Sequence, residues 1–274
     1  SYILFFTDKG KCYWVKVYDI PEGGRAAKGR AIVNLVGCEP DEKVSAFISV
    51  KEFNDDHFVV MATEKGIVKK TKLSAYSNPR KKGIYAVEIR DGDKLIEARV
   101  STGDNDILLG TRNGKSIRFS EEQIRPSGRK TMGVKGITLS SEDDRLVGML
   151  LIKREGTTVL VATEKGFGKR TEISQYRAQK RGGKGVLTMK TTDKVGKMVT
   201  IKEVVDKDDL MIITNQGVLI RQPVSQIRAI GRATQGVKLI KLGEGTLVSS
   251  ITRIMSEEDS GDENNSTEPK GNTE

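Results

Sequence analysis

The sequence predicts an all-β, propeller-like disc built from four-stranded blades. Two observations carry this prediction. First, an apolar run, a Thr-x-x-Gly segment and a second run, basic in most copies, follow one another five times, with the glycines at 10, 66, 114, 166 and 217. Second, the intervals of 56, 48, 52 and 51 residues define one period of about 50, which is typical of propeller blades. Radially arranged blades also leave only short exposed sheet edges.

Each repeat is predicted to open with a β-hairpin. The apolar runs predict first strands at residues 2–6, 58–62, 107–110, 159–162 and 210–213. The residues before each glycine are mostly short or polar, and glycine itself adopts positive φ without strain, which suits a tight turn between antiparallel strands. The run after each glycine is the predicted second strand.

Two further strands complete each repeat. A glycine followed by an apolar run predicts third strands at 29–35, 83–89, 136–139, 185–189 and 236–242. A last apolar run predicts fourth strands at 44–50, 95–100, 146–152, 198–204 and 247–254. Four strands in about 50 residues predict one blade per repeat, with almost no helix.

Composition changes abruptly after Met255. Residues 256–274 consist largely of Ser, Glu, Asp, Asn and Gly and contain no large apolar side chain, so they cannot bury enough surface to become ordered. We therefore predict one domain at 1–255 and a disordered acidic tail at 256–274. The repeats lie at about 1–51, 52–101, 102–153, 154–205 and 206–255.

Charge is unevenly distributed along the chain. The sequence has 47 Lys and Arg against 37 Asp and Glu, a net charge of +10. The tail carries seven acidic residues and one lysine, so residues 1–255 hold a net charge of +16. A body this basic attracts a polyanion, because each Lys or Arg that meets a phosphate releases condensed counterions. Nucleic acid is the expected partner, and a solvated basic surface without a ligand is the alternative.

Signatures of catalysis and of zinc binding are missing. His57 is the single histidine, and no Gly-x-Ser-x-Gly motif is present, which leaves no hydrolytic site. Cys12 and Cys38 have no further Cys or His at zinc-binding spacing. Residues 110–116 place three residues between two glycines where a phosphate-binding loop needs four. We predict no catalytic residue, no metal and no cofactor.

Two acidic runs are expected to form solvated turns. They lie at residues 142–144 and 206–209, and a metal site is the alternative.

The sequence shows no membrane or export signal. No apolar run approaches the roughly 20 residues of a membrane helix, and no signal peptide is present, so a reducing cytoplasm is the expected location. The chain begins with Ser1, and we interpret it as a piece of a longer protein.

Basic residues recur at equivalent places in successive repeats. One set follows the hairpin glycines: Lys69, Lys70, Lys115, Arg118, Lys169, Arg170 and Arg221. A second set surrounds the start of the third strands: Arg25, Lys28, Arg30, Arg80, Lys81, Lys82, Arg129, Lys130, Lys135, Arg177, Arg228 and Arg232. Radial blades would place both sets on one rim that contacts phosphates without reading bases. Because only seven Phe, six Tyr and one Trp are available for stacking on single strands, we predict duplex DNA as the ligand.

A glycine-rich basic box gives the chain a family resemblance. Residues 177–185, Arg-Ala-Gln-Lys-Arg-Gly-Gly-Lys-Gly, are very similar to the box that marks the DNA gyrase A C-terminal domain family, and residues 10–23, 29–35 and 231–237 resemble blades of that family. The resemblance covers residues 1 to about 255, and the acidic tail is also similar. It implies a DNA-binding box formed by Gln179, Lys180, Arg181, Gly182, Gly183, Lys184 and Gly185.

The resemblance implies a β-pinwheel, in which neighbouring blades exchange strands and duplex DNA wraps around a basic edge. It also implies a bacterial, nucleoid-associated parent enzyme, a heterotetramer of gyrase A with gyrase B, which carries the ATPase. ATP and Mg²⁺ would then act in other domains to drive negative supercoiling. The chain departs from the family pattern because it has five repeats instead of six and carries its box in the fourth repeat instead of the first. We therefore expect the fragment to start after the family's first blade.

Three alternatives compete with this interpretation. The corresponding DNA-binding domain of the related topoisomerase IV has a degenerate box and often fewer blades. A protein-interaction propeller of the WD or kelch kind would bind partners without nucleic acid, but its Gly-His and Trp-Asp signatures are missing. A propeller enzyme would need a convergent acid, base or metal constellation, which the sequence does not show.

Overall fold

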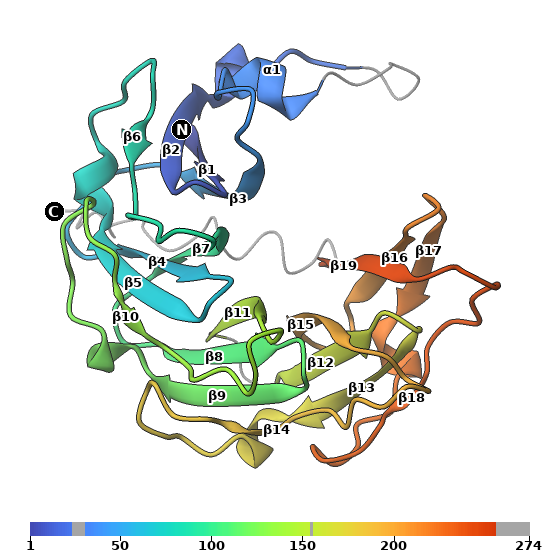
Figure 1. Ribbon diagram of the computed structural model, residues 1–274. Helices are drawn as coiled ribbons and strands as arrows, with labels where there is room; N and C mark the ends of the chain where they lie inside the picture. Colours follow the sequence, from blue (N-terminus) through green and yellow to red (C-terminus); the bar gives the residue numbers. More distant parts are fainter. Residues whose placement is uncertain (24–30, 154–155, 256–274) are drawn as a thin grey trace, which may run out of the picture. The chain divides into compact units, whose positions relative to one another are not determined.

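The computed structural model describes residues 1–23, 31–153 and 156–255 (Figure 1). The chain divides into two compact units: unit 1 comprises Ser1–Lys153 and Tyr176–Thr188, and unit 2 comprises Arg154–Gln175 and Met189–Glu274. The predicted acidic tail lies outside the described residues, as do Arg25, Lys28 and Arg30.

Unit 1 contains three four-stranded antiparallel sheets, each with a hairpin at its centre, a long strand on one side and a two-residue strand on the other. The first sheet has the order β3 (Val44–Val50), β1 (Tyr2–Thr7), β2 (Lys11–Lys16) and β6 (Ile84–Tyr85). The second has the order β7 (Leu95–Ser101), β4 (Phe58–Thr63), β5 (Ile67–Lys72) and β10 (Val134–Lys135). The third has the order β11 (Leu146–Ile152), β8 (Asp106–Thr111), β9 (Lys115–Ser120) and β14 (Val186–Leu187).

The described part of unit 2 contains two sheets, each built around the same kind of central hairpin. The first has the order β15 (Met198–Val204), β12 (Thr158–Thr163), β13 (Phe167–Glu172) and β18 (Val237–Lys238). The second has three strands in the order β19 (Val248–Ile254), β16 (Asp209–Thr214) and β17 (Leu219–Pro223). The prediction of an all-β fold with one hairpin per repeat is confirmed.

The two-residue strands come from the following repeat. β6, β10, β14 and β18 pair with β2, β5, β9 and β13, each of which belongs to the repeat before. The prediction that a repeat builds a blade from its own four strands is therefore wrong, whereas the strand exchange implied by the resemblance is present. The predicted third strands shorten to two residues because the chain then turns inward, where Ala86, Val87 and Ile137 are buried.

The predicted strand at 29–35 is replaced by a short helix. In its described part the chain forms α1 (Ile32–Val36), preceded by the N-cap residue Ala31, whose carbonyl accepts from the amide of Asn34 at 3.0 Å. Each of the other four third runs pairs with the second strand of the preceding repeat. Among the described residues, α1 has no second strand of a preceding repeat to pair with. An extended segment without a partner leaves its backbone groups unpaired, and a helical turn satisfies part of them. Short 3-10 turns also follow the second strands: η1 (Val17–Asp19), η2 (Leu73–Tyr76), η3 (Glu121–Gln123), η4 (Ile173–Gln175) and η5 (Val224–Gln226).

The central strands are buried on both faces. In β4, Val59 and Met61 belong to a cluster with residues of β1, whereas Val60 and Ala62 belong to a cluster with residues of β8. This double burial explains why the first strands read as continuous apolar runs, because alternation is expected only where one face meets water. The second strands β5 and β13 are also buried over most of their length and end on exposed residues, Lys72 and Glu172.

Candidate nucleic-acid interface

Four basic loops lead into the exchanged strands. We name them by the strand that follows: the β6 loop (78–82), the β10 loop (125–132), the β14 loop (177–184) and the β18 loop (228–235). The first three belong to unit 1 and the last to unit 2. Most of the predicted rim residues that lie on or beside them are exposed: Arg80, Lys81, Lys82, Lys130, Lys135, Arg177, Lys180, Lys184 and Arg228. Others are half-buried: Arg129, Gln179, Arg181 and Arg232.

Three of these loops are joined to the preceding repeat in one shared way. A parallel β-bridge links Lys70 to Pro126, Arg118 to Ala178 and Arg170 to Ala229. The amide that follows each bridged loop residue donates to the strand carbonyl: Ser127 to Lys70 at 2.8 Å, Gln179 to Arg118 at 2.8 Å and Ile230 to Arg170 at 2.9 Å. The β10, β14 and β18 loops therefore each begin with the same local pairing to the second strand of the preceding repeat.

The far ends of the same loops bond to the third run of the repeat before. The carbonyl of Thr131 accepts from the amide of Glu88 at 3.1 Å, Gly183 accepts from Thr138 at 2.9 Å, and Thr234 accepts from Lys190 at 3.0 Å. A loop fixed at both ends presents its exposed side chains in a defined place. Preorganised charges of this kind lower the ordering cost of binding.

Several predicted rim residues prove to be internal. Lys69, Lys70, Lys169 and Arg170 are buried, so their assignment to an exposed rim is wrong. Arg118, which is half-buried, and Arg221, which is exposed, pair with Asp106 and Asp209 on the neighbouring strand, at 2.5 and 2.6 Å. Lys115 is half-buried at the start of β9.

The buried charges have identifiable partners. Lys70 lies 3.5 Å from the carboxylate of the fully buried Glu121 and 5.0 Å from the ring centre of Phe58. Arg170 pairs with Asp206 and donates from Nε to the carbonyl of Ile227 at 2.6 Å. These contacts satisfy charges that would otherwise be costly to bury.

Lys69 and Lys169 differ because their Nζ atoms donate to loop carbonyls and, within the described residues, form no ion pair with a carboxylate. Burial, together with the positive charge of Arg129 and against the opposing charge of Glu88, lowers the pKa of Lys69 to about 7. Burial and the charge of Arg232 lower the pKa of Lys169 to about 8. Both shifts follow from removing an ammonium group from water.

Within the predicted box the side chains divide into two roles. Arg181 donates to the carbonyls of Gln123 and Lys135 at 2.9 and 3.1 Å, so its guanidinium joins the box to η3 and to β10. Lys180 and Lys184 are exposed and are the box side chains available to a phosphate. Gly185 lies so close to β9 that an added Cβ would overlap the carbonyl oxygen of Ser116.

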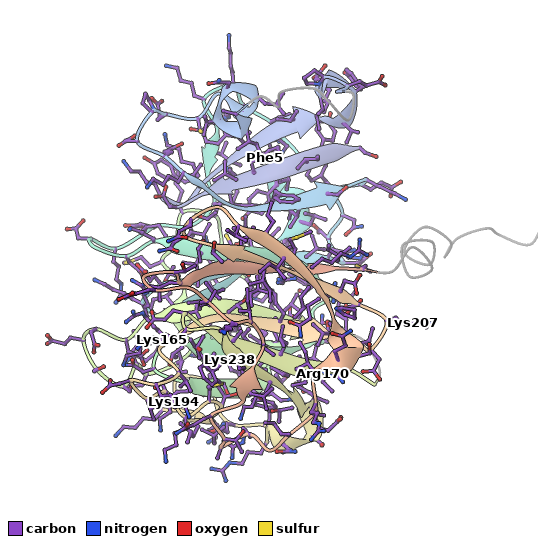
Figure 2. All side chains as sticks on the ribbon, turned by 90° about the vertical axis from the view of Figure 1, so that its right-hand side faces the viewer. Phe5, Lys165, Arg170, Lys194, Lys207 and Lys238 are labelled. Carbon is purple, nitrogen blue, oxygen red and sulfur yellow. The ribbon has the colours of Figure 1, made fainter. Side chains whose placement is uncertain are left out.

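A second basic feature lies in unit 2, and the sequence prediction did not include it. Lys165, Lys194 and Lys238, which are labelled in Figure 2, line a cavity of about 500 Å³ whose lining also includes Phe167. Lys238 lies 5.6 Å from the ring centre of Phe167, a cation–π distance. These lysines come from a hairpin turn, a later loop and an exchanged strand, so no linear pattern groups them.

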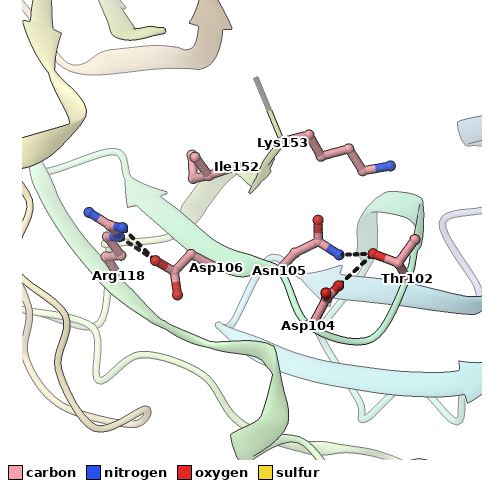
Figure 3. A pocket seen from close by; sticks show the side chains of 7 residues that line it. All are labelled: Thr102, Asp104, Asn105, Asp106, Arg118, Ile152 and Lys153. Carbon is pink, nitrogen blue, oxygen red and sulfur yellow. Dashed lines mark hydrogen bonds and ion pairs between the residues drawn. The ribbon is translucent and has the colours of Figure 1, made fainter. Parts of the chain in front are cut away.

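A polar cavity on the third sheet of unit 1 has a mixed charge. Its lining includes Asp104, Asp106, Arg118 and Lys153 (Figure 3). Arg118 is paired with Asp106, and Thr102 donates to Asp104 at 2.6 Å. A cavity with both signs of charge, already joined by internal bonds, does not favour an anion or a cation.

The two acidic runs lie at turns, although Asp209 begins β16, and the expectation that their acids are solvated is wrong for Asp144 and Asp208, which are buried. Asp144 accepts from the amides of Asn113 and Arg145 at 2.9 and 3.0 Å, and Asp208 accepts from the amide of Val205 at 2.9 Å. Within the described ranges, no three His, Cys, Asp or Glu side chains are grouped to hold a metal ion. In that same part of the chain, no helix is long and apolar enough to span a membrane.

Comparisons with known proteins agree with this architecture. A family model described as the DNA gyrase C-terminal domain, a β-propeller, matches residues 1–51, 57–102, 105–153, 157–204 and 208–254. A DNA gyrase A of Staphylococcus epidermidis is 45% identical over 94% of this chain, and one of Staphylococcus aureus is 44% identical over 100% of it. The chain covers 29% and 31% of these relatives' lengths, less than a third of each.

Solved structures show the same fold. A C-terminal domain of DNA topoisomerase IV superposes with a TM-score of 0.85 at 25% identity, covering 93% of this chain and 79% of that chain. A DNA gyrase A C-terminal domain superposes with a TM-score of 0.80 at 22% identity, covering 93% and 82%. Because the family model matches a segment in each of the five repeats, the chain belongs to the DNA gyrase C-terminal domain family.

Proposed function

We propose that this chain binds duplex DNA along its four basic loops and bends or wraps it, as the C-terminal domain of a DNA gyrase A. The observation that carries the proposal is the exposed lysine and arginine of these loops, three of which are fixed to successive repeats by the same hydrogen bonds. Such side chains contact phosphates and not base edges, so little sequence preference is expected.

Contacts with several basic loops could offset the free-energy cost of bending the DNA. Bending a short duplex by 40 to 90° costs on the order of 1–6 kcal/mol. Contacts spread over several loops offset this cost where a single patch would not. In unit 2 the cavity lysines Lys165, Lys194 and Lys238 add positive charge to that of the β18 loop.

We further propose that the chain serves a whole enzyme. In that enzyme, gyrase B and other domains of gyrase A would supply ATP hydrolysis with Mg²⁺ and DNA strand passage, and the bound duplex would be presented for negative supercoiling. The names of the curated relatives support this assignment. The chain itself would supply binding and geometry and no catalytic group.

A topoisomerase IV role is the second candidate. It is favoured by the TM-score of 0.85 to a topoisomerase IV C-terminal domain and by the position of the box in the fourth repeat. Such a domain is expected to bind DNA with weak wrapping, so the two candidates differ in the DNA topology they produce.

Replacing both Lys180 and Lys184 by Ala is expected to lower the salt dependence of duplex binding. Each lost phosphate contact lowers the slope of log K against log salt by about 0.9, so the double variant should lose roughly 1.8. The measurement is fluorescence anisotropy of a labelled duplex of about 40 base pairs between 50 and 200 mM salt. Lys43→Ala/Lys51→Ala, which removes the same charge from the two ends of β3, is the control and should keep the wild-type slope. Equal loss in both variants would mean that net charge, and not the box, governs binding.

A further inference from the structure

Two buried lysines donate hydrogen bonds to backbone carbonyls, most of which lie in the basic loops. Lys69 on β5 donates to the carbonyls of Ala86 at 2.7 Å and Arg129 at 2.5 Å. Lys169 on β13 donates to Gly231 at 2.7 Å, to Arg232, and to the carbonyl and hydroxyl of Thr234 at 3.2 and 3.0 Å. The side chains are 1% and 0% exposed, so neither ammonium group lies on the surface.

The same position is apolar or aromatic in the other three repeats. It is the third residue after the hairpin glycine, and Tyr13, Ile117 and Ile220 occupy it there. Packing therefore does not require a lysine at this place. Ile117 lies on β9, next to the β14 loop. That loop is fixed instead by its own Arg181, which donates to the carbonyls of Gln123 and Lys135.

The chemistry of an ammonium group suits the task. An ammonium group has three donors and no acceptor. The ammonium group of Lys169 donates to the three carbonyls of Gly231, Arg232 and Thr234. Carbonyls that turn inward to a lysine fix the backbone of the loop, and the loop's own basic side chains are left for the outer surface. Lys130, next to the bound Arg129 carbonyl, is exposed.

We propose that Lys69 and Lys169 are positioning residues for DNA binding, which hold the β10 and β18 loops so that the loops' basic side chains meet phosphates. The two lysines do not contact DNA themselves. This inference rests on the proposed function, because it names the residues that shape the DNA-binding loops.

Hydrogen exchange without DNA tests the positioning directly. In Lys169→Met we expect faster exchange of the amides of Lys190 and Arg232, which donate to Thr234 and Gln175. The rate should rise at least about tenfold, which corresponds to a decrease of roughly 1.4 kcal/mol in the free energy of local opening. Amides of the β12–β13 hairpin should be unchanged, because their bonds lie within the sheet. Unchanged exchange at Lys190 and Arg232 would overturn the proposal whether or not the chain binds DNA.

A double-mutant cycle on the full chain separates positioning from direct contact. Lys130→Ala should weaken duplex binding about threefold in the wild type and hardly at all in Lys69→Met, because a displaced loop no longer places Lys130 on a phosphate. Lys65→Met, a lysine at the exposed turn of the β4–β5 hairpin, is the control and should leave the effect of Lys130→Ala intact. Additive effects of Lys69→Met and Lys130→Ala would refute the proposal, whereas failure of the wild type to bind duplex would refute the proposed function instead.

Discussion

Replacing Glu121 by Ala should lower the free energy of unfolding of unit 1 by roughly 3–5 kcal/mol, the cost of leaving one partner of a buried ion pair alone. Glu121 is fully buried and lies 3.5 Å from Lys70. It also accepts from Ser101 at 2.5 Å and from Asn105 at 3.2 Å. Denaturant unfolding followed by circular dichroism measures the change.

An exposed ion pair of the same unit gives the matched control. Asp55 pairs with Lys72 at 3.0 Å, and both side chains are about half exposed or more. Asp55→Ala should cost less than about 1 kcal/mol, because exposed pairs are screened by water. If Glu121→Ala cost no more than Asp55→Ala, Lys70 would have another way to satisfy its charge, and the role given to this pair would be wrong.

Gly185→Ala should lower stability by about 2–5 kcal/mol and loosen β14. Gly185 has a φ of +68°, and a Cβ there would overlap the carbonyl oxygen of Ser116. A left-handed conformation costs a non-glycine residue about 1–2 kcal/mol, and crowding against backbone adds about 1–3 kcal/mol. The loss should appear in thermal unfolding and as faster exchange of the Thr188 amide, which bonds to Gly114.

The neighbouring Gly183 is the control for this prediction. Its added Cβ would meet only ordinary contacts, with Ile117 and Lys180 both at 3.5 Å, so Gly183→Ala should change stability by less than about 0.5 kcal/mol. Equal destabilisation by both substitutions would contradict the assignment of Gly185 to strand packing. A loss of DNA affinity in Gly183→Ala alone would place a phosphate against its backbone.

Much of the fold could be predicted because its elements are local. The hairpins depend on a turn glycine between two nearby runs, and the predicted strand at 44–50 coincides with β3 (Val44–Val50). The partner of each third run could not be derived from the repeat alone, because pairing across repeats leaves the same local pattern as pairing within one. The helix α1 was missed for the same reason, since its sequence differs little from runs that do find a partner strand.

The candidate site was predicted in outline, and its errors have a physical origin. Exposed loop lysines such as Lys130 and Lys180 follow from charge and turn composition. Charge alone predicts a surface position for Lys69 and Lys169, although Ile117 and Ile220 at the equivalent position indicate burial. Arg181 looked like a phosphate ligand, but its carbonyl partners lie on segments far away in the sequence.

The linking number of a closed circular plasmid, relaxed by a type I topoisomerase in the presence of this chain, tests most directly whether the four basic loops guide duplex DNA along a curved, chiral path. We predict a positive shift that grows with protein concentration, shrinks in Lys180→Ala/Lys184→Ala and persists in Lys43→Ala/Lys51→Ala. Binding without any shift would contradict wrapping and favour a domain that only holds DNA, as expected for the topoisomerase IV candidate. No binding at all would contradict the proposed function.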